Sequence, residues 1–386
     1  MIGELFKKEE KKVEYIELIY DLIFVYIIGR NNSLLSSVEN GFIPGSVYLT
    51  YFLTTLIALH IWYLTTVFIN RYGSKSVAEY VGIFINMYLL YYMADGTRVG
   101  WQSYYTKYNI AWGLILVNLA VQYFIKLRQV EKLTPWVTAH IKFSLGMLLG
   151  EAVIVFASVP LFSLTGIPLS PLALLFVLLP LFLRRDLSRL MSVDFAHLTE
   201  RVMLYVVFTF GEMIISISGY FSGGFNLRST YFSLMAFLIV AGLFLIYGYF
   251  YDHIIDREQD TSGTGYMLLH IFLITALNNI SVALEFMREP EVDAVPKTIF
   301  LVASFVVYYI FLFSLEKYAY GCKKPSVKFW ALIIGVSVLF AALIALSYNM
   351  SDLSIAITVC YIYSMFAISV IHSRLHRRKV GEDDRR

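Results

Sequence analysis

The chain has 386 residues, of which 58% are hydrophobic, 17% aromatic and only 15% charged, and its mean hydropathy is +0.67. Soluble domains carry roughly a quarter of charged residues, so this composition excludes an ordinary soluble protein and predicts an all-α, polytopic membrane protein. The net charge of +3 is small, and it indicates membrane orientation and contact with membrane lipids but no nucleic-acid binding.

Twelve apolar stretches are long enough to form transmembrane helices, since about 20 residues cross the hydrocarbon core. They lie at 13–30, 47–70, 76–96, 108–127, 136–158, 166–184, 197–220, 230–251, 264–286, 297–316, 327–348 and 352–373. Before the first stretch, lysines alternate with Glu9 and Glu10, which is not the pattern of a cleavable signal peptide. We therefore expect the first span to be retained.

Basic residues are concentrated in alternate connections between these spans. One side of the membrane would hold both termini and most lysines and arginines, while the other side would keep Arg30, Arg98, Lys107, Arg228, Arg288 and Lys297. Cytoplasmic loops carry the excess of basic residues in membrane proteins. We therefore predict a multi-pass protein of the cell (cytoplasmic) membrane with both termini in the cytoplasm.

Three pairs of short motifs suggest an internal duplication. Glu17 and Glu200 each open an acid-bearing span, Tyr51 and Tyr231 each precede a Phe at the start of the next, and similar tripeptides begin at Gly82 and His270. The offsets are similar, as two parallel six-helix repeats would give. The predicted organisation is a cytoplasmic N-terminal segment (1–12), a first six-helix half (13–184), a cytoplasmic linker (185–196), a second six-helix half (197–373) and a basic cytoplasmic tail (374–386).

The first span carries three carboxylates in an otherwise apolar helix. Glu14, Glu17 and Asp21 are spaced i, i+3 and i+7, which places them on one stripe of a helix. A central Asp in a membrane helix costs about 2.5–3.5 kcal/mol on insertion scales, so the stripe must face protein or water. Glu14 and Glu17 could lie in the headgroup region, but the apolar residues beyond Asp21 leave its short side chain few routes to water.

The seventh span repeats this anomaly. His197, Glu200 and Arg201 lie near its start, and Glu212 follows Arg201 by eleven residues on nearly the same helix face. About 16 Å separates Arg201 from Glu212 along the axis, so Glu212 needs a partner on another helix or a proton. For Glu200 and Arg201, a salt-bridged helix start near the interface is an equally good interpretation.

Other polar residues lie within the fifth and ninth spans. Glu151 follows His140 by eleven residues in the fifth span, and the ninth contains His270, Asn278 and Asn279. A lone helical histidine is more often a packing residue than a ligand, and adjacent asparagines point in different directions, so these are secondary candidates. His60 and Trp62 of the second span are weaker still.

Buried acids outnumber buried bases in this set. The predicted proton or ion pathway consists of Glu17, Asp21, Glu151, Glu200, Arg201 and Glu212, with His140, His197, His270, Asn278 and Asn279 as secondary candidates. Carboxylates in a low dielectric can load and release protons near neutral pH. No phosphate-binding loop, nucleophile elbow or metal motif is present, so we predict no cofactor and no metal site, and no catalytic residue is assigned.

Three motifs resemble those of the bacterial low-temperature-requirement protein A (LtrA) family. ELIYDLIFV at 17–25 is similar to its acidic opening helix, HLTER at 197–201 with GE at 211–212 to a later helix, and NRY at 70–72 to an N-R-F turn. The chain departs from the family's paired tryptophans, since His60, Ile61 and Trp62 stand in the second span. The resemblance implies a multi-helix cytoplasmic-membrane protein associated with growth in the cold, without a defined molecular activity.

The surplus of buried acids favours a proton- or cation-coupled secondary transporter over an enzyme. In this hypothesis Glu17 and Asp21 of one half face Glu200, Arg201 and Glu212 of the other around a central cavity. An ion channel, an intramembrane lipid-handling protein or enzyme, and a structural or sensory protein remain alternatives. The small ion or solute is not identified by the sequence, and homo-oligomerisation stays open.

Overall fold

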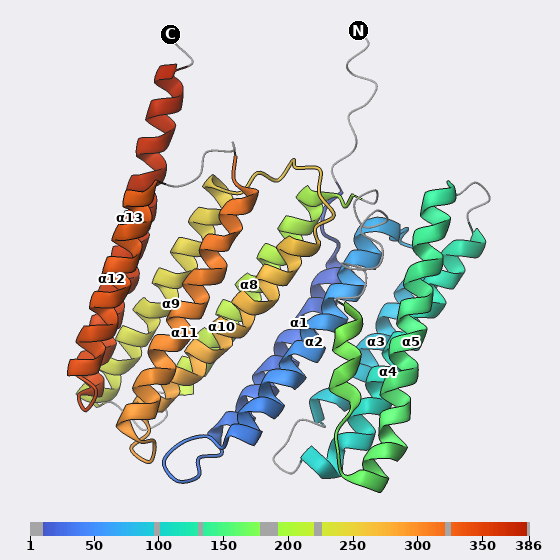
Figure 1. The fold of residues 1–386 in the computed structure, drawn as a ribbon, viewed down its shortest axis with the longest axis horizontal. Coiled ribbons are helices and arrows are strands. Elements are labelled where there is room, and N and C mark those ends of the chain that lie inside the picture. Colours follow the sequence, from blue (N-terminus) through green and yellow to red (C-terminus); the bar gives the residue numbers. More distant parts are fainter. Residues whose placement is uncertain are drawn as a thin grey trace. The chain divides into compact units, whose positions relative to one another are not determined.

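A computed structural model describes residues 11–95, 101–129, 134–177, 192–219, 226–320 and 326–383. Every named element in these ranges is a helix, and extended pairing is limited to two isolated bridges, Glu39 with Phe42 and Ile255 with Ala319. The predicted all-α class is therefore confirmed for the part of the chain that the structure describes (Figure 1).

The helices follow the apolar stretches of the sequence. They are α1 (Tyr15–Asn32), η1 (Ser33–Ser36), α2 (Gly45–Tyr72), α3 (Val77–Asp95), α4 (Trp101–Gln129), α5 (Pro135–Thr165), η2 (Ser170–Val177), α8 (Phe195–Ser218), α9 (Leu227–His253), α10 (Thr264–Arg288), α11 (Ala294–Ser314), η4 (Leu315–Tyr318), α12 (Val327–Leu346) and α13 (Ser351–Asp383). Each predicted span except the sixth coincides with one α-helix. Where the sixth span was expected to begin, the chain instead forms the short 3₁₀ helix η2, and residues 178–191 lie outside the described residues.

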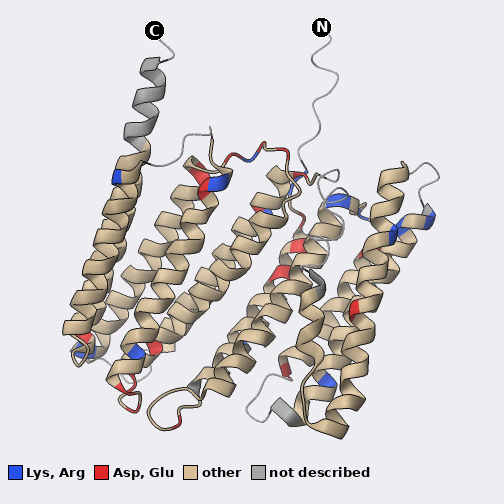
Figure 2. Cartoon of the chain, viewed as in Figure 1, with Lys and Arg blue, Asp and Glu red and all other residues tan. Residues whose placement is uncertain are grey.

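Ten of the described helices are long and apolar enough to cross a membrane. The α1 helix is not among them, because its 18 residues include Glu17, Asp21 and Arg30. Long uncharged stretches run through the helices, and most charged residues lie at helix ends and in connecting segments, while a few carboxylates lie within helices (Figure 2). The helices therefore support a multi-pass membrane protein, while the count of twelve spans stays a prediction.

The helix ends are set by local sequence signals. At the start of α5, the Thr134 side chain accepts a hydrogen bond from the backbone N–H of Val137, and Pro135 occupies the first helical position, where its missing N–H is harmless. Gly166 ends α5 with φ of 70°, a left-handed conformation that glycine adopts without strain. Side chains of Asn226 and Ser326 cap α9 and α12 in the same way as Thr134.

The chain divides into two compact units. The first contains residues 1–37, 44–205 and 257–271, and the second contains residues 38–43, 206–256 and 272–386. Helices α8 and α10 each contribute residues to both units. The boundaries of these two units differ from those of the two predicted six-helix halves. The internal duplication therefore stays a prediction.

Helix pairs in the first unit pack closely. The α4 helix contacts both α3 and α5, and α1 contacts α2 and α3 (Figure 1). Gly113 of α4 lies against the ring of Phe156 on α5, so that an added Cβ would be only 2.6 Å from the ring carbons. In the second unit, α13 packs against α9 and α12, and α11 against α12.

Candidate functional site

The guanidinium of Arg201 is fully buried and binds both carboxylates of α1. Its Nε donates to Asp21 Oδ2 at 3.0 Å and its Nη2 to Asp21 Oδ1 at 2.8 Å, while Nη1 donates to Glu17 Oε2 at 2.8 Å. Arg201 and Asp21 are 0% exposed and Glu17 is 2% exposed. Glu17 and Asp21 are one helical turn apart, so both can face the same fork of donors on α8.

Trp62 of α2 supplies a further donor to Asp21. Its indole Nε1–H donates to Asp21 Oδ1 at 2.9 Å, and its ring packs on Tyr205 with ring centroids 4.4 Å apart. Asp21 therefore accepts three hydrogen bonds, a pattern that favours the ionised carboxylate. Residues from α1, α2 and α8 meet at this single side chain, and we name Glu17, Asp21, Trp62, His197 and Arg201 the Arg201 cluster.

Asn70, at the end of α2, fixes the tautomer of His197. The Asn70 amide is oriented by two bonds to the backbone of Asp194: its Oδ1 accepts from the N–H at 2.9 Å, and its Nδ2 donates to the carbonyl at 2.9 Å. The same Nδ2 lies 3.0 Å from His197 Nδ1. Because an amide nitrogen only donates, Nδ1 must accept, so the proton of the imidazole is on Nε2 and the ring is neutral.

Within the Arg201 cluster, the Nε2–H of His197 faces Glu17. It lies 3.4 Å from Glu17 Oε1 but lacks hydrogen-bond geometry to it. With a neutral imidazole, the cluster holds two carboxylates and one guanidinium. One negative charge therefore remains in a site whose members are almost completely buried.

Substitution of Asn70 by aspartate should change the protonation of His197. The introduced carboxylate would accept from Nδ1–H, so His197 would have an acceptor at each ring nitrogen and become an imidazolium. We expect ¹⁵N NMR of histidine-labelled protein at neutral pH to show this change. Asn226→Asp, at the exposed start of α9, is the matched control and should leave the His197 signals unchanged; a neutral His197 in Asn70→Asp would contradict the assignment.

Lys11 brings a second cation to the same end of α2. Its ammonium donates to the carbonyl oxygens of Ile69 at 2.7 Å and Asn70 at 3.2 Å in the last turn of α2, and the Ile69 carbonyl also accepts from the backbone N–H of Gly73. Burial lowers the pKa of Lys11, while the carboxylates of Glu17 and Asp194, among others, oppose this shift. Lys11 therefore partly balances the charge of the cluster without binding its carboxylates directly.

The remaining acid of the predicted stripe lies apart from the cluster. Glu14 is the N-cap residue of α1 and forms an ion pair with Lys75 near the surface. The hydrogen bond to Glu14 raises the pKa of Lys75. The interpretation of Glu14 as an interfacial residue thus fits its position, whereas Glu17 and Asp21 are buried.

Polar contacts also join α2 to α5, at two levels. Near the end of α2, Arg71 Nη1 lies 2.9 Å from His140 Nε2, and the Tyr72 hydroxyl lies 2.6 Å from His140 Nδ1. Eleven residues away in both helices, His60 Nε2 lies 2.8 Å from Glu151 Oε1. The equal spacing follows from antiparallel helices with the same rise per residue, so His140 and Glu151 share the face of α5 that meets α2.

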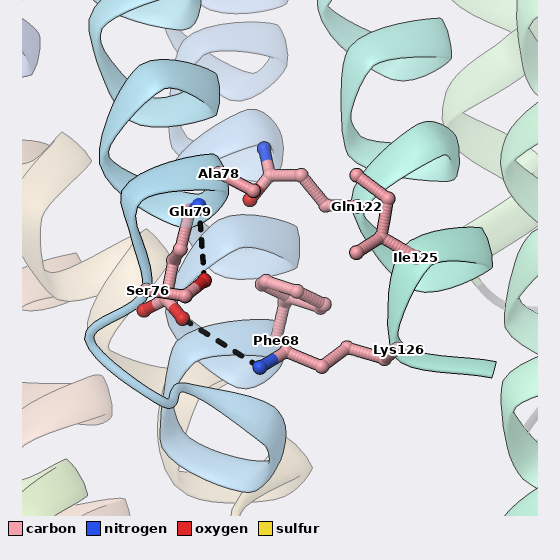
Figure 3. Close-up of a pocket in the computed structure, with 7 residues that line it drawn as sticks. All are labelled: Phe68, Ser76, Ala78, Glu79, Gln122, Ile125 and Lys126. Atoms are coloured by element: carbon pink, nitrogen blue, oxygen red, sulfur yellow. Dashed lines mark hydrogen bonds and ion pairs between the residues drawn. The ribbon is translucent and has the colours of Figure 1, made fainter. Parts of the chain in front are cut away.

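A small hollow that is open to solvent lies between α3 and α4. Its lining residues are drawn in Figure 3: Phe68, Ser76, Ala78, Glu79, Gln122, Ile125 and Lys126. Lys126 Nζ lies 3.9 Å from Glu79 Oε2, which also accepts from the backbone N–H of Ser74 at 2.8 Å. This hollow is separate from the described contacts of Arg201, and none of its lining residues was predicted as a site residue.

The other predicted residues take different positions. The described hydrogen bonds and ion pairs include neither Glu200 nor Glu212, which are both half-buried, so these contacts do not support the expectation that they face Glu17 and Asp21. His270 Nδ1 lies 2.9 Å from the carbonyl oxygen of Tyr266 in its own helix. Asn278 donates to the carbonyl of Ile274, also within α10, and Asn279 is buried.

Sequence reasoning does not predict the contacts of three residues in these sites. His60 and Trp62 were weak candidates, yet they contact Glu151 and Asp21, and Asn70 was noted only as part of a family motif. One usable signal was the need of each mid-span acid for a donor, because His60 and Trp62 stand near the middle of a long apolar helix.

Together, the apolar helices and the buried ionic cluster define an integral membrane protein that spans the bilayer several times. The family described as Bacterial low temperature requirement A protein (LtrA) matches residues 12–368, which is most of the chain. The chain therefore belongs to the LtrA family, as its motifs predicted. No curated protein and no solved structure matches it.

Proposed function

We propose that this protein is a proton- or cation-coupled secondary transporter and that the Arg201 cluster is its proton- or cation-binding site. The observation that carries this proposal is the charge of the cluster. Two carboxylates face one guanidinium, and Asn70 holds the adjacent imidazole neutral. A buried site with a residual negative charge favours uptake of one positive charge.

In this proposal Glu17 takes the proton, because it accepts fewer hydrogen bonds than Asp21. Asp21 already accepts three hydrogen bonds, two from Arg201 and one from Trp62. Glu17 has one strong donor, Arg201 Nη1, while His197 Nε2 is 3.4 Å away. A proton on Glu17 would therefore remove the residual charge and break fewer contacts than a proton on Asp21.

Protonation of Glu17 would weaken one link between α1 and α8. The Nη1–Oε2 hydrogen bond is charge-assisted, and neutral partners bind less strongly. The remaining links, through Asp21, would persist. Such a change can shift the balance between two packings of the helices, as alternating access requires.

Purified protein in liposomes can test this proposal with protons, Na⁺ and K⁺ as the probes. We expect vesicles with a pH indicator in the lumen to dissipate an imposed pH gradient faster when an opposing Na⁺ or K⁺ gradient is present. Glu17→Gln should reduce this rate by about tenfold or more, because it removes the proton acceptor. Glu39→Gln, which changes an exposed loop carboxylate, should match the wild type.

The proposal fails if the wild type responds no more than protein-free vesicles, or if Glu17→Gln transports as fast as the wild type. In either case a structural role becomes the better interpretation of the cluster. The complete pairing of Asp21 with Arg201 and Trp62 favours that second candidate, in which the buried ions only fix the register of α1, α2 and α8. Glu17→Gln would then alter thermal stability and leave ion movement unchanged.

A further inference from the structure

His60 and Glu151 form a buried acid–base contact outside the Arg201 cluster. His60 Nε2 lies 2.8 Å from Glu151 Oε1, and the two residues are 4% and 3% exposed. His60 is near the middle of α2, and Glu151 is near the middle of α5. The contact is therefore about 16 Å along α2 from Arg71, which lies in the last turn of that helix.

The α2 helix separates this contact from the Arg201 cluster. His60 and Trp62 are two residues apart, which places them on nearly opposite faces of a helix at almost the same level. Trp62 donates to Asp21 of α1, whereas His60 contacts Glu151 of α5. The two sites therefore lie at similar depth but have different partners.

Neither simple protonation state satisfies the His60–Glu151 contact. With Glu151 ionised and His60 neutral, Nε2–H donates to the carboxylate, and the pair holds one uncompensated negative charge. With one more proton the pair is neutral, but Nδ1 then carries a hydrogen. The described structure gives His60 Nδ1 no hydrogen-bond partner.

These two defects are of comparable size. An unpaired charge in a membrane helix is costly, and so is a buried N–H without an acceptor. Each state thus leaves one buried group uncompensated, and conversion between the states moves one proton without the rearrangement of another ion pair. The site differs in this respect from Asp21, which a guanidinium neutralises directly.

Ionisable groups from three helices contact α2 at or near the level of His60. Glu151 faces it from α5, while α1 directs Asp21 to Trp62 on the other side of α2. From α4, the Tyr108 hydroxyl donates to the carbonyl of Thr54, between one and two turns from His60. Glu151 is thus the charged partner in direct contact with His60 among the described contacts.

We propose that His60 and Glu151 form a second proton-binding site, which takes up one proton from water and releases it again. Proton uptake converts the pair from a net charge of −1 to zero. His60 Nδ1 then carries a hydrogen, the other hydrogen stays between Nε2 and Oε1, and no bond forms or breaks between heavy atoms. A role of this site in transport rests on the proposed function. Proton binding itself does not, and it can be measured separately.

Two spectroscopic measurements test proton binding on the purified protein between pH 5 and pH 9. ¹⁵N NMR of histidine-labelled protein reports the protonation of His60, with His60→Gln used to assign its signals. Infrared spectroscopy reports a protonated Glu151 carboxyl. We expect one of these signals to titrate in the wild type and to be lost in Glu151→Gln, whose amide can still accept a hydrogen bond from Nε2.

Glu39→Gln serves as the matched control, because it removes an exposed carboxylate without touching either helix. The proposal is overturned if neither group titrates in the wild type, or if Glu151→Gln titrates like the wild type. Titration that persists while Glu17→Gln fails to affect transport would retain this site and reject the proposed function. If Glu17→Gln abolishes transport but neither His60 nor Glu151 titrates, the proposed function stands and the second proton-binding site is rejected.

Discussion

Arg201→Met should lower the free energy of unfolding by about 3–5 kcal/mol, the usual cost of removing one partner of a buried ion pair. The reason is that Glu17 and Asp21 would keep their charges without the guanidinium that now donates three hydrogen bonds to them. Thermal unfolding of purified protein in detergent micelles measures the effect. We expect a large decrease in melting temperature and a low yield of folded protein.

Two further variants test whether this loss of stability comes from the buried charges. Arg228→Met removes a surface ion pair with Asp352, in which the arginine side chain is 75% exposed, and should cost less than about 1 kcal/mol. Combining Arg201→Met with Glu17→Gln and Asp21→Asn removes the buried charges as well, and should recover much of the lost stability. No recovery in the triple variant would show that the size of the arginine, and not its charge, stabilises the protein.

Trp62→Ala should also destabilise the protein by about 3–5 kcal/mol, because it deletes a fully buried ring and the indole donor to Asp21. Trp62→Phe keeps most of the ring contact with Tyr205 and loses the donor, so it should cost about 1–3 kcal/mol. The difference between the two variants separates packing from hydrogen bonding. Denaturant titration in mixed micelles provides the two values.

Trp136 is a matched control for this pair of variants. It lies at the start of α5 and is 58% exposed, so Trp136→Ala should change the unfolding free energy by less than about 0.5 kcal/mol in detergent. If Trp62→Ala and Trp136→Ala change the unfolding free energy equally, the buried ring and the hydrogen bond to Asp21 assigned to Trp62 would be contradicted.

The sequence indicated which residues need an ionic partner, but not how they pair. Glu17, Asp21 and Arg201 stand within apolar stretches, where an unpaired charge is costly, so each had to have a partner. Helical periodicity also placed Glu17 and Asp21 on one face. The pairing between them could not be derived, because 180 residues separate Asp21 from Arg201 and several other charged residues were available.

The contacts of α2 were harder to predict. His60 and Trp62 are neutral side chains that occur in many apolar helices as packing residues, and nothing in their spacing names a partner on α1 or α5. Only tertiary packing brings Glu151 to His60 and Asp21 to Trp62. The predicted start of the sixth span was wrong for another reason. A continuous apolar run does not show by itself whether the chain forms an α-helix or the shorter 3₁₀ helix η2.

Asp21 and Arg201 lie 180 residues apart, so the ribosome makes the two partners at different times. At about 5–20 residues per second, roughly 10–40 s pass between them. Trp62, 41 residues after Asp21, is made much earlier and offers the nascent helix its first donor. The acids of α1 must therefore persist without the guanidinium until Arg201 is made, and a chain truncated before Arg201 would lack it permanently and expose itself to proteolytic quality control.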